Sequence, residues 1–349
     1  MEKKFKKIAI VEFVRTHYDF IISVHEYLYK KGYRDIKILT SSEIWKDIEY
    51  QLIKIENHIN PTNVFTAGKV KNYFYILKNN FDVIYFNSFY YSWKNIIGLL
   101  LLKILKRDTD IILTLHNIRR HFEYKSKFKF APLKKILITV IDKKINKYIV
   151  LNEKLKEFAS KYTKKEILVI PFKIPLKQEI LTVYKYSSSF YKIIIPGIIS
   201  NKRRNYDELI KVIKNVLSKR TDFKFILLGR IVSKELIVPL TRLKQQFPQN
   251  IQFFSSYIEQ ELFEKYVIES DIILAPIRKN VDSNPQEQYG LTKASGIEFD
   301  AYKYKKPILI PSFYEIQNDN IDVTYFNTYD DLTKILLKYP KKDSFLMSA

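Results

Sequence analysis

The sequence predicts an α/β protein that folds as two doubly wound domains with parallel sheets. Short apolar, β-branched segments alternate with segments of helical spacing along nearly the whole chain, and this alternation is typical of parallel sheets covered by helices. The length of 349 residues suits two domains better than one. Residues 173–190 break the alternation with Pro175, a polar stretch and three serines at 187–189, and we interpret them as the linker.

The first predicted domain covers residues 1–172, an ordinary size for one domain. A first strand is expected at residues 7–14, where apolar and β-branched residues dominate, and a helix at 20–33 ends near Gly32. Further strands are expected at residues 35–40, 81–86, 110–115, 145–151 and 167–170. Further helices are expected at residues 93–105 and 153–162.

The second predicted domain covers residues 191–335. Its strands are expected at residues 191–196, 223–228, 251–254, 272–276 and 308–310. Its helices are expected at residues 207–217 and 259–270 and shortly after Gly296. Residues 336–349 are expected to form a C-terminal tail that could return to the first domain.

The chain is strongly basic, and most of the excess lies in its first half. The formal net charge is +23, and residues 1–175 supply +17 of it, with 34 Lys and Arg against 17 Asp and Glu. A basic half indicates an anionic partner such as a phosphate-bearing acceptor, a membrane surface or nucleic acid. AT-rich codon usage would explain the abundance of Lys, Ile, Tyr and Asn equally well, so both causes stay open.

Composition also bounds the compartment. The chain has no cysteine, which excludes a disulfide framework and thiolate chemistry. No apolar run reaches the roughly 18 residues of a spanning helix, and the apolar stretch near the N-terminus is too short for a signal peptide. We therefore expect a cytoplasmic protein, with peripheral association at the inner face of the cell membrane as an option.

Residues 289–312 contain the most informative local pattern: a polar loop with glycine, a short helix and an apolar strand. Backbone N–H groups at the start of such a helix can hold phosphate, and carboxylates one turn further on can bind sugar hydroxyls. The segment resembles the donor-binding segment of GT-B glycosyltransferases, which have two Rossmann-like domains facing across a cleft. The donor-binding residues that the resemblance implies here are Lys293, Ser295, Gly296, Glu298 and Asp300.

The resemblance covers most of residues 190–312 and, more faintly, the first domain. Cations after the strand at 191–196 would neutralise the donor diphosphate, although a solvated basic turn is the alternative. The usual Gly-Arg pair of the family is absent from this loop, and Thr292 stands where many retaining relatives have a glutamate. The further donor contacts implied here are Gly197, Lys202, Arg203, Arg204, Arg230 and Tyr257.

His116 is the candidate catalytic residue. It ends the predicted strand at 110–115, at the edge where open α/β sheets bind ligands. Relatives often have a histidine here that contacts the transferred sugar, and an imidazole can donate a hydrogen bond or relay a proton. A purely structural histidine is the alternative. The acceptor-binding candidates in this half are Arg15, His17, Asn87, Arg119 and Arg120.

Residues 119–135 combine seven Lys and Arg with four Phe and Tyr and a single acidic residue. Interleaved cations and aromatic rings suit a membrane interface with anionic lipids. They also suit single-stranded nucleic acid, which is the less expected partner, and an ordinary solvated loop is the third reading.

Motifs of several other enzyme classes are missing. The five histidines form no H-E-x-x-H motif, and neither a Walker A loop, a G-x-G-x-x-G fingerprint nor a G-x-S-x-G elbow occurs. We therefore expect a glycosyltransferase that uses a nucleotide-diphosphate sugar, needs no metal or cofactor, and acts on a glycan or lipid-linked acceptor. The resemblance implies retention at the anomeric carbon and surface polysaccharide assembly. A sugar-nucleotide epimerase of the same fold, and a non-catalytic membrane- or nucleic-acid-binding protein, are the alternatives.

Overall fold

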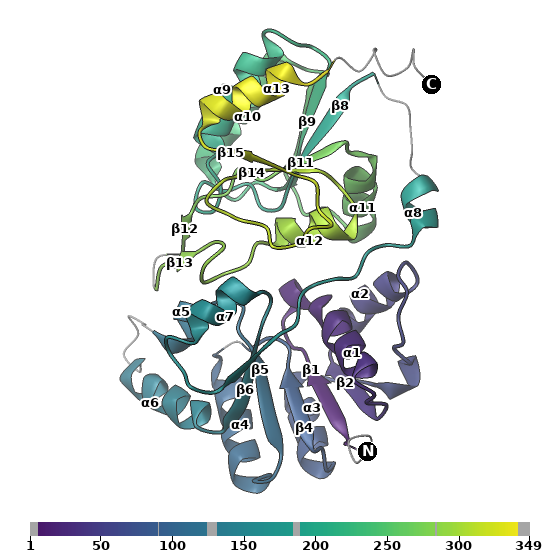
Figure 1. The fold of residues 1–349 in the computed structure, drawn as a ribbon, viewed down its shortest axis with the longest axis vertical. Helices are drawn as coiled ribbons and strands as arrows, with labels where there is room; N and C mark the ends of the chain where they lie inside the picture. The colour runs from purple at the N-terminus through teal and green to yellow at the C-terminus, as the bar shows by residue number, and fades with distance from the viewer. Residues whose placement is uncertain (1–5, 90, 124–130, 184–188, 283–284, 341–349) are drawn as a thin grey trace. The chain divides into compact units, whose positions relative to one another are not determined.

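The computed structural model describes residues 6–89, 91–123, 131–183, 189–282 and 285–340, and it divides into two compact units (Figure 1). The first unit consists of Met1–Ile174, Ser283–Glu287 and Leu291–Ala294. The second unit consists of Pro175–Asp282, Gln288–Gly290 and Ser295–Ala349. The chain therefore returns to the first unit twice after residue 282, which the contiguous division expected from the sequence does not contain.

The first unit contains a sheet of seven parallel strands in the order β3-β2-β1-β4-β5-β6-β7. The strands are β1 Ile8–Val11, β2 Ile36–Thr40, β3 Val64–Thr66, β4 Val83–Phe86, β5 Asp110–Thr114, β6 Ile145–Val150 and β7 Glu166–Val169. The helices are α1 Phe20–Lys30, α2 Ser42–Leu52, α3 Lys69–Lys78, α4 Trp93–Leu105, α5 Ile118–Phe122, α6 Ala131–Asp142 and α7 Glu153–Ala159, with the 3₁₀ turns η1 Arg15–His17 and η2 Pro61–Asn63.

Local chemistry explains several boundaries in this unit. β1 ends at Val11, three residues before the end expected from the sequence, because the Glu12 carboxylate accepts the Val14 N–H at 2.6 Å and turns the chain. Ser41 caps α2 by accepting the Ile44 N–H, and Ser92 caps α4 by accepting the Asn95 N–H. Five helices and strands of this unit were not expected from the sequence, namely α2, β3, α3, α5 and α6.

The second unit contains a sheet of six parallel strands in the order β10-β9-β8-β11-β14-β15. The strands are β8 Tyr191–Pro196, β9 Phe223–Arg230, β10 Ile251–Phe254, β11 Ile272–Leu274, β14 Ile308–Pro311 and β15 Val323–Phe326. The helices are α8 Gln178–Val183, α9 Tyr206–Leu217, α10 Ile237–Gln246, α11 Gln260–Glu269, α12 Gly296–Lys303 and α13 Tyr329–Lys338, with the 3₁₀ turn η3 Lys234–Leu236. A separate two-stranded sheet pairs β12 Asn280–Val281 with β13 Glu287–Gln288.

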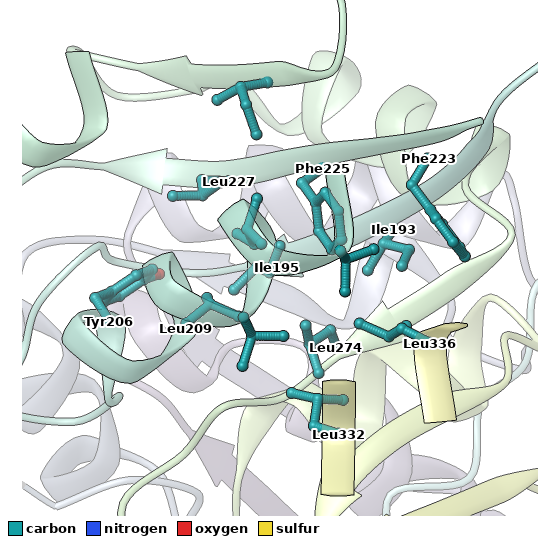
Figure 2. Packing of buried hydrophobic residues seen from close by; sticks show 14 of the residues in the cluster. Ile193, Ile195, Tyr206, Leu209, Phe223, Phe225, Leu227, Leu274, Leu332 and Leu336 are labelled. Carbon is teal, nitrogen blue, oxygen red and sulfur yellow. The ribbon is translucent and has the colours of Figure 1, made fainter. Parts of the chain in front are cut away.

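The core of the second unit lies between β8, β9 and the helices α9 and α13 (Figure 2). Buried side chains recur at helical spacing along α9, including Leu209, Val212, Ile213 and Val216, so one face of that helix covers the sheet. β8 carries a continuous buried run at residues 193–196 because helices cover both faces of a parallel sheet. Each buried Ile or Leu contributes roughly 1.5–3 kcal/mol to folding.

The two sheets share one connectivity, in which the first strand of each unit lies beside the second and fourth. This order and the parallel pairing confirm the expected α/β class with two Rossmann-like, doubly wound units. α13 continues to Lys338, beyond the residue 335 at which the second domain was expected to end. Within the described parts of the chain, every helix is too short or too polar to cross a bilayer.

Candidate functional site

In the first unit, the carboxyl ends of β1, β4 and β5 bring together Glu12, Asn87 and His116, with His17 of η1 beside them. We call these four residues the strand-end cluster. β4 pairs with both β1 and β5 in parallel, so the three strand ends meet at one edge of the sheet. The chain connections change direction between β1 and β4, and open α/β sheets bind ligands at such a point.

Glu12 is the buried centre of this cluster. Its Oε2 accepts a hydrogen bond from Asn87 Nδ2 at 2.5 Å, and its Oε1 accepts the Val14 N–H. Burial raises the pKa of Glu12 to about 7, although the hydrogen bonds from Asn87 and Val14 act in the opposite direction. The Glu12 carboxyl group therefore titrates near neutral pH.

His116 is held by a carbonyl and by aromatic rings. Its Nε2 lies 2.9 Å from the backbone oxygen of Asn87, its ring stacks on His17 with centroids 4.1 Å apart, and Phe20 meets it edge-on. Burial lowers the pKa of His116 to about 4, and the charge of Lys293 acts in the same direction. Because a carbonyl only accepts, Nε2 carries the proton of the neutral ring, and Nδ1 is left as an acceptor.

Two short returning segments of the first unit, residues 285–287 and 291–294, bind the start of α5, which follows His116 in the chain. The Glu287 carboxylate accepts the Arg120 N–H at 2.7 Å, and the Thr292 carbonyl accepts the Ile118 N–H at 3.1 Å. Two orphan amides of the α5 N-terminus are thereby satisfied by residues more than 160 positions away in the chain. Burial raises the pKa of the Glu287 carboxyl group.

The predicted acceptor residues take different positions in this unit. His17 and Asn87 belong to the strand-end cluster, whereas Arg15 is exposed and pairs with Asp47 of α2 at 2.8 Å. Arg119 donates to the Gln286 carbonyl at 3.3 Å, with its guanidinium 5.5 Å from the Phe158 ring centroid. Arg120 has an exposed side chain.

Lys293 belongs to the first unit, although the resemblance places it among the donor-binding residues of the second domain. Its charge acts on both His116 and Glu287, which sets it near the strand-end cluster and the start of α5. Its proposed contact with the donor phosphate stays a prediction.

In the second unit, the ends of β8 and β9 approach each other at Gly197 and Gly229. A Cβ at Gly229 would lie 2.0 Å from the Gly197 oxygen, so no side chain fits there. Gly197 has a φ of +96°, and a Cβ on it would lie 2.5 Å from Arg204 Nη2. Gly197 is thus required by backbone conformation and by the packing of Arg204.

The three cations after β8 differ in exposure and in partners. Arg204 is buried, and its guanidinium donates to the Pro196 carbonyl at 2.6 Å and the Ile198 carbonyl at 3.0 Å. Arg203 is half-exposed and lies 3.5 Å from Asp282, while Lys202 is exposed. Arg204 therefore holds the shape of the loop, and Lys202 and Arg203 present its accessible charge.

The start of α12 is organised by Tyr314. The Tyr314 hydroxyl accepts the Ser295 N–H at 3.0 Å and donates to Glu298 Oε2 at 2.5 Å. Burial raises the pKa of Glu298. Glu298 is thus committed to an internal hydrogen bond, whereas Asp300 is half-exposed. A Cβ at Gly296 would have no heavy atom within 4 Å, so the first turn of α12 is open.

Within the second unit, Tyr289 and Gly290 link the start of α12 to the loop after β8, residues 197–204, which we call the β8 loop. The charges of Arg203 and Arg204 act on the Tyr289 hydroxyl, and a Cβ at Gly290 would lie 3.3 Å from the Tyr314 ring. At its other end α12 is anchored by a buried ion pair, in which Lys303 Nζ lies 3.3 Å from Glu264 Oε1. The two parts of the predicted donor site are therefore connected through a short segment.

The remaining predicted donor residues are less constrained. Arg230 is exposed at the end of β9, and the Tyr257 side chain is 63% exposed in the loop after β10. Among the residues that the structure describes, no group of three or more His, Asp or Glu side chains is placed to hold a metal ion.

Glu12 is the main residue that sequence reasoning missed. The strand expected at residues 7–14 placed it inside a strand, whereas the observed β1 ends one residue before it. The rule that directed attention to Asn87 and His116, a polar residue directly after a buried strand, applies equally to Glu12.

Comparison with solved structures identifies the fold. The glycosyltransferase from Rickettsia africae ESF-5 is 19% identical, with a TM-score of 0.57 over 98% of this chain and 89% of that one. The catalytic domain of starch synthase IV from Arabidopsis thaliana, bound to ADP and acarbose, is 10% identical, with a TM-score of 0.56 over 97% and 93%. This chain has the GT-B fold.

The GT-B fold is not confined to glycosyltransferases. A UDP-N-acetylglucosamine 2-epimerase is 12% identical, with a TM-score of 0.50 over 97% of this chain and 89% of that one. No protein-family model matches the sequence, and no curated protein matches it. The GT-B fold of the chain therefore rests on its three-dimensional structure.

Proposed function

We propose that this chain is a glycosyltransferase that moves a sugar from a nucleoside diphosphate to a glycan or lipid-linked acceptor. The observation that carries the proposal is a pair of features in the second unit that suit an anion. Lys202 and Arg203 are accessible cations after β8, and the first turn of α12 lies uncovered at Gly296, next to Tyr314. A helix N-terminus and flanking cations suit a diphosphate. The GT-B fold, found in a glycosyltransferase and in a starch synthase bound to ADP, adds support.

In the proposed reaction, the bond between the anomeric carbon and the diphosphate oxygen breaks while the acceptor hydroxyl oxygen bonds to that carbon. The hydroxyl proton leaves with the diphosphate. Lys202, Arg203 and the α12 amides would stabilise the negative charge on the departing diphosphate, which is the largest catalytic effect expected here. We propose that this requires neither a metal ion nor a cofactor, and that the anomeric configuration is retained.

On the first unit, the strand-end cluster is proposed to bind sugar hydroxyls. The neutral His116 ring, with its proton on Nε2, can accept a hydrogen bond at Nδ1. Arg15, Arg119 and Arg120 would serve an acceptor that carries phosphate. Such an acceptor suits surface polysaccharide or glycoconjugate assembly at the inner face of a cell membrane. The anionic membrane contact predicted for residues 119–135 includes residues 124–130, which lie outside the described residues.

Thermal unfolding with UDP, GDP, ADP, CMP and their sugar conjugates tests the donor site. A micromolar site at millimolar ligand should raise the Tm visibly, because binding to the folded state adds RT ln(1 + [L]/Kd) to its stability. The variant Lys202→Ala/Arg203→Ala should lose most of this shift. The matched control is Lys214→Ala/Lys219→Ala, which removes two exposed lysines at the far end of α9 and should keep it. A shift unchanged in the first variant would contradict the proposed phosphate site.

A sugar-nucleotide epimerase is the second candidate, favoured by the likeness to a UDP-N-acetylglucosamine 2-epimerase. Incubation of the stabilising nucleotide sugar without acceptor separates the two activities. An epimerase converts the sugar nucleotide to an isomer, while a glycosyltransferase leaves it intact or releases the free diphosphate slowly. If no nucleotide shifts the Tm, a non-catalytic membrane- or nucleic-acid-binding protein becomes the better description.

A further inference from the structure

The helices α3, α4 and α6 carry a concentration of exposed apolar side chains on the first unit. Nine of the nineteen large apolar side chains that are exposed in the described residues lie on these three helices. They are Val70 and Phe74 on α3, Trp93, Ile97, Leu101, Ile104 and Leu105 on α4, and Leu133 and Ile136 on α6. Isolated exposed apolar residues are ordinary, but a contiguous group marks a surface that meets a partner.

The three helices form one continuous face. α4 contacts both α3 and α6, and the three can be followed in Figure 1. α3 and α4 approach closely at Gly98, where a Cβ would lie 2.5 Å from the Tyr73 ring. On α4 the exposed residues Trp93, Ile97, Leu101 and Ile104 recur at intervals of three and four, so they share one outward stripe.

The charged side chains of α3 and α4 are all positive. α3 contains three lysines and α4 contains two, and neither helix contains an Asp or Glu. Where α3 and α4 begin, Gly68, Val70, Lys69, Lys71 and Lys94 line a surface hollow. Lysines around a hollow suit a phosphate group, and the apolar stripe beside it suits acyl chains.

We propose that the α3-α4-α6 face docks on the surface of an anionic lipid bilayer, with the apolar stripe in the headgroup region and the lysine-lined hollow against lipid phosphates. Complementary charge selects this partner over a second copy of the chain, because two copies of a face with lysines and no carboxylates on α3 and α4 repel each other. The surface differs from the segment at 119–135 that the sequence predicted for the same purpose. The docking is separate from glycosyl transfer, because lipid binding requires neither donor nor acceptor.

Co-sedimentation of the full chain with vesicles tests the docking surface. We expect binding to phosphatidylcholine vesicles that contain phosphatidylglycerol, weaker binding to phosphatidylcholine alone, and loss of binding at high salt. Ile97→Asp/Ile104→Asp should reduce binding to the anionic vesicles by roughly tenfold or more, since it places two charges in the apolar stripe. The matched control, Ile237→Asp/Val238→Asp, changes two similarly exposed apolar residues at the start of α10 in the second unit and should bind normally.

A second variant protects the test against misfolding. Lys71→Glu/Lys94→Glu changes only exposed side chains at the hollow and should also reduce anionic-vesicle binding by roughly tenfold or more. Melting curves check that every variant is folded. Binding that is equal for all variants, or absent for the wild type, would overturn the proposal. Concentration-dependent self-association that Ile97→Asp/Ile104→Asp abolishes, without vesicle binding, would overturn it in favour of an interface between copies.

Trp93 reports on the same surface directly. The chain has two tryptophans, Trp45 and Trp93, and Trp45→Phe leaves Trp93 on α4 as the only one. With anionic vesicles, its emission should shift to the blue and be quenched by brominated acyl chains, because an indole at a membrane interface leaves water. Protein that sediments with the vesicles while its Trp93 emission stays unchanged would show that another surface binds, against the proposal.

Discussion

Glu12 and His116 lie at neighbouring strand ends, and burial moves their pKa values in opposite directions. Burial disfavours the charged form of each group, so the pKa of the Glu12 carboxyl rises to about 7 and that of the His116 imidazole falls to about 4. Asn87 joins them, because its side chain donates to Glu12 and its carbonyl accepts from His116. A change in the protonation of Glu12 can therefore affect the hydrogen bond of His116 through Asn87.

Glu12→Gln should change how stability depends on pH. The folded-state pKa of about 7 lies above the unfolded value of 4.5, so this contribution to the free energy of unfolding is fully present below pH 4.5 and is lost as the pH rises through 7. Glutamine does not titrate. Between pH 4.5 and 8 the variant should gain about 3 kcal/mol relative to the wild type in urea unfolding. The exposed Glu56→Gln is the control, and a pH-independent difference for Glu12→Gln would contradict the assignment.

His116→Ala should lower turnover by about 100-fold or more while donor affinity stays within a factor of about two. The reason is that His116 is proposed to contact the reacting sugars and not the donor diphosphate. His58→Ala, which removes an exposed histidine of the same unit, should leave turnover unchanged. If His116→Ala loses stability and donor affinity as strongly as turnover, the histidine has a structural role.

At the scale of single elements, α12 is held at both ends by buried polar groups. Tyr314 fixes its start through Ser295 and Glu298, and the buried ion pair of Lys303 with Glu264 fixes its end. A helix held in this way keeps its free N-terminal amides in one position, which lowers the cost of binding an anion there.

Tyr314→Phe tests this arrangement. Loss of the hydroxyl leaves the Glu298 carboxyl and the Ser295 amide without their partner, at a cost of about 1–3 kcal/mol in unfolding free energy. The nucleotide-dependent rise in Tm should fall as well, because the start of α12 loses its anchor. Tyr325→Phe removes a hydroxyl that accepts the Ile316 N–H in a more exposed place, and it should cost less than about 1 kcal/mol. Equal effects of the two changes would argue against a special role for Tyr314.

At the scale of the whole molecule, two units of the same strand order carry different chemistry. The first unit holds the strand-end cluster and the α3-α4-α6 face, while the second holds the β8 loop and the start of α12. The excess positive charge is concentrated in residues 1–175, where the proposed membrane and acceptor contacts lie.

Hydrogen exchange can show whether the units bind different ligands. A nucleoside diphosphate should slow exchange of backbone amides at residues 197–204 and 295–300, because bound ligand suppresses local opening. Anionic vesicles should instead slow exchange on α3 and α4. Protection by nucleotide that is strongest at the strand-end cluster would reverse the proposed assignment of donor and acceptor.

Alternating apolar segments and helical spacing were enough to predict the α/β class, two domains and most strands, because the burial of a sheet by helices leaves a period in the sequence. In the first unit the same pattern missed α2, β3, α3, α5 and α6, and in the second unit it missed α8, α10, β15 and α13. The sequence of α3, KVKNYFYILK, has a weak apolar face, and it is held as a helix by packing against α4 at Gly98 and Tyr73.

Motif order along the chain was enough to direct attention to His116, Asn87, the β8 loop and the start of α12. The hydrogen-bond partners and burial of these residues depend on contacts distant in sequence, which no local pattern encodes. Glu12 meets Asn87 across 75 positions, Glu287 meets Arg120 across 167, and Tyr314 reaches back to Glu298 and Ser295. Burial at such contacts determines which carboxyl groups hold a proton. It also determines which cations, such as Arg204, donate their hydrogen bonds to backbone carbonyls. Both effects require the packed chain, because desolvation and these hydrogen bonds arise only when the chain is folded.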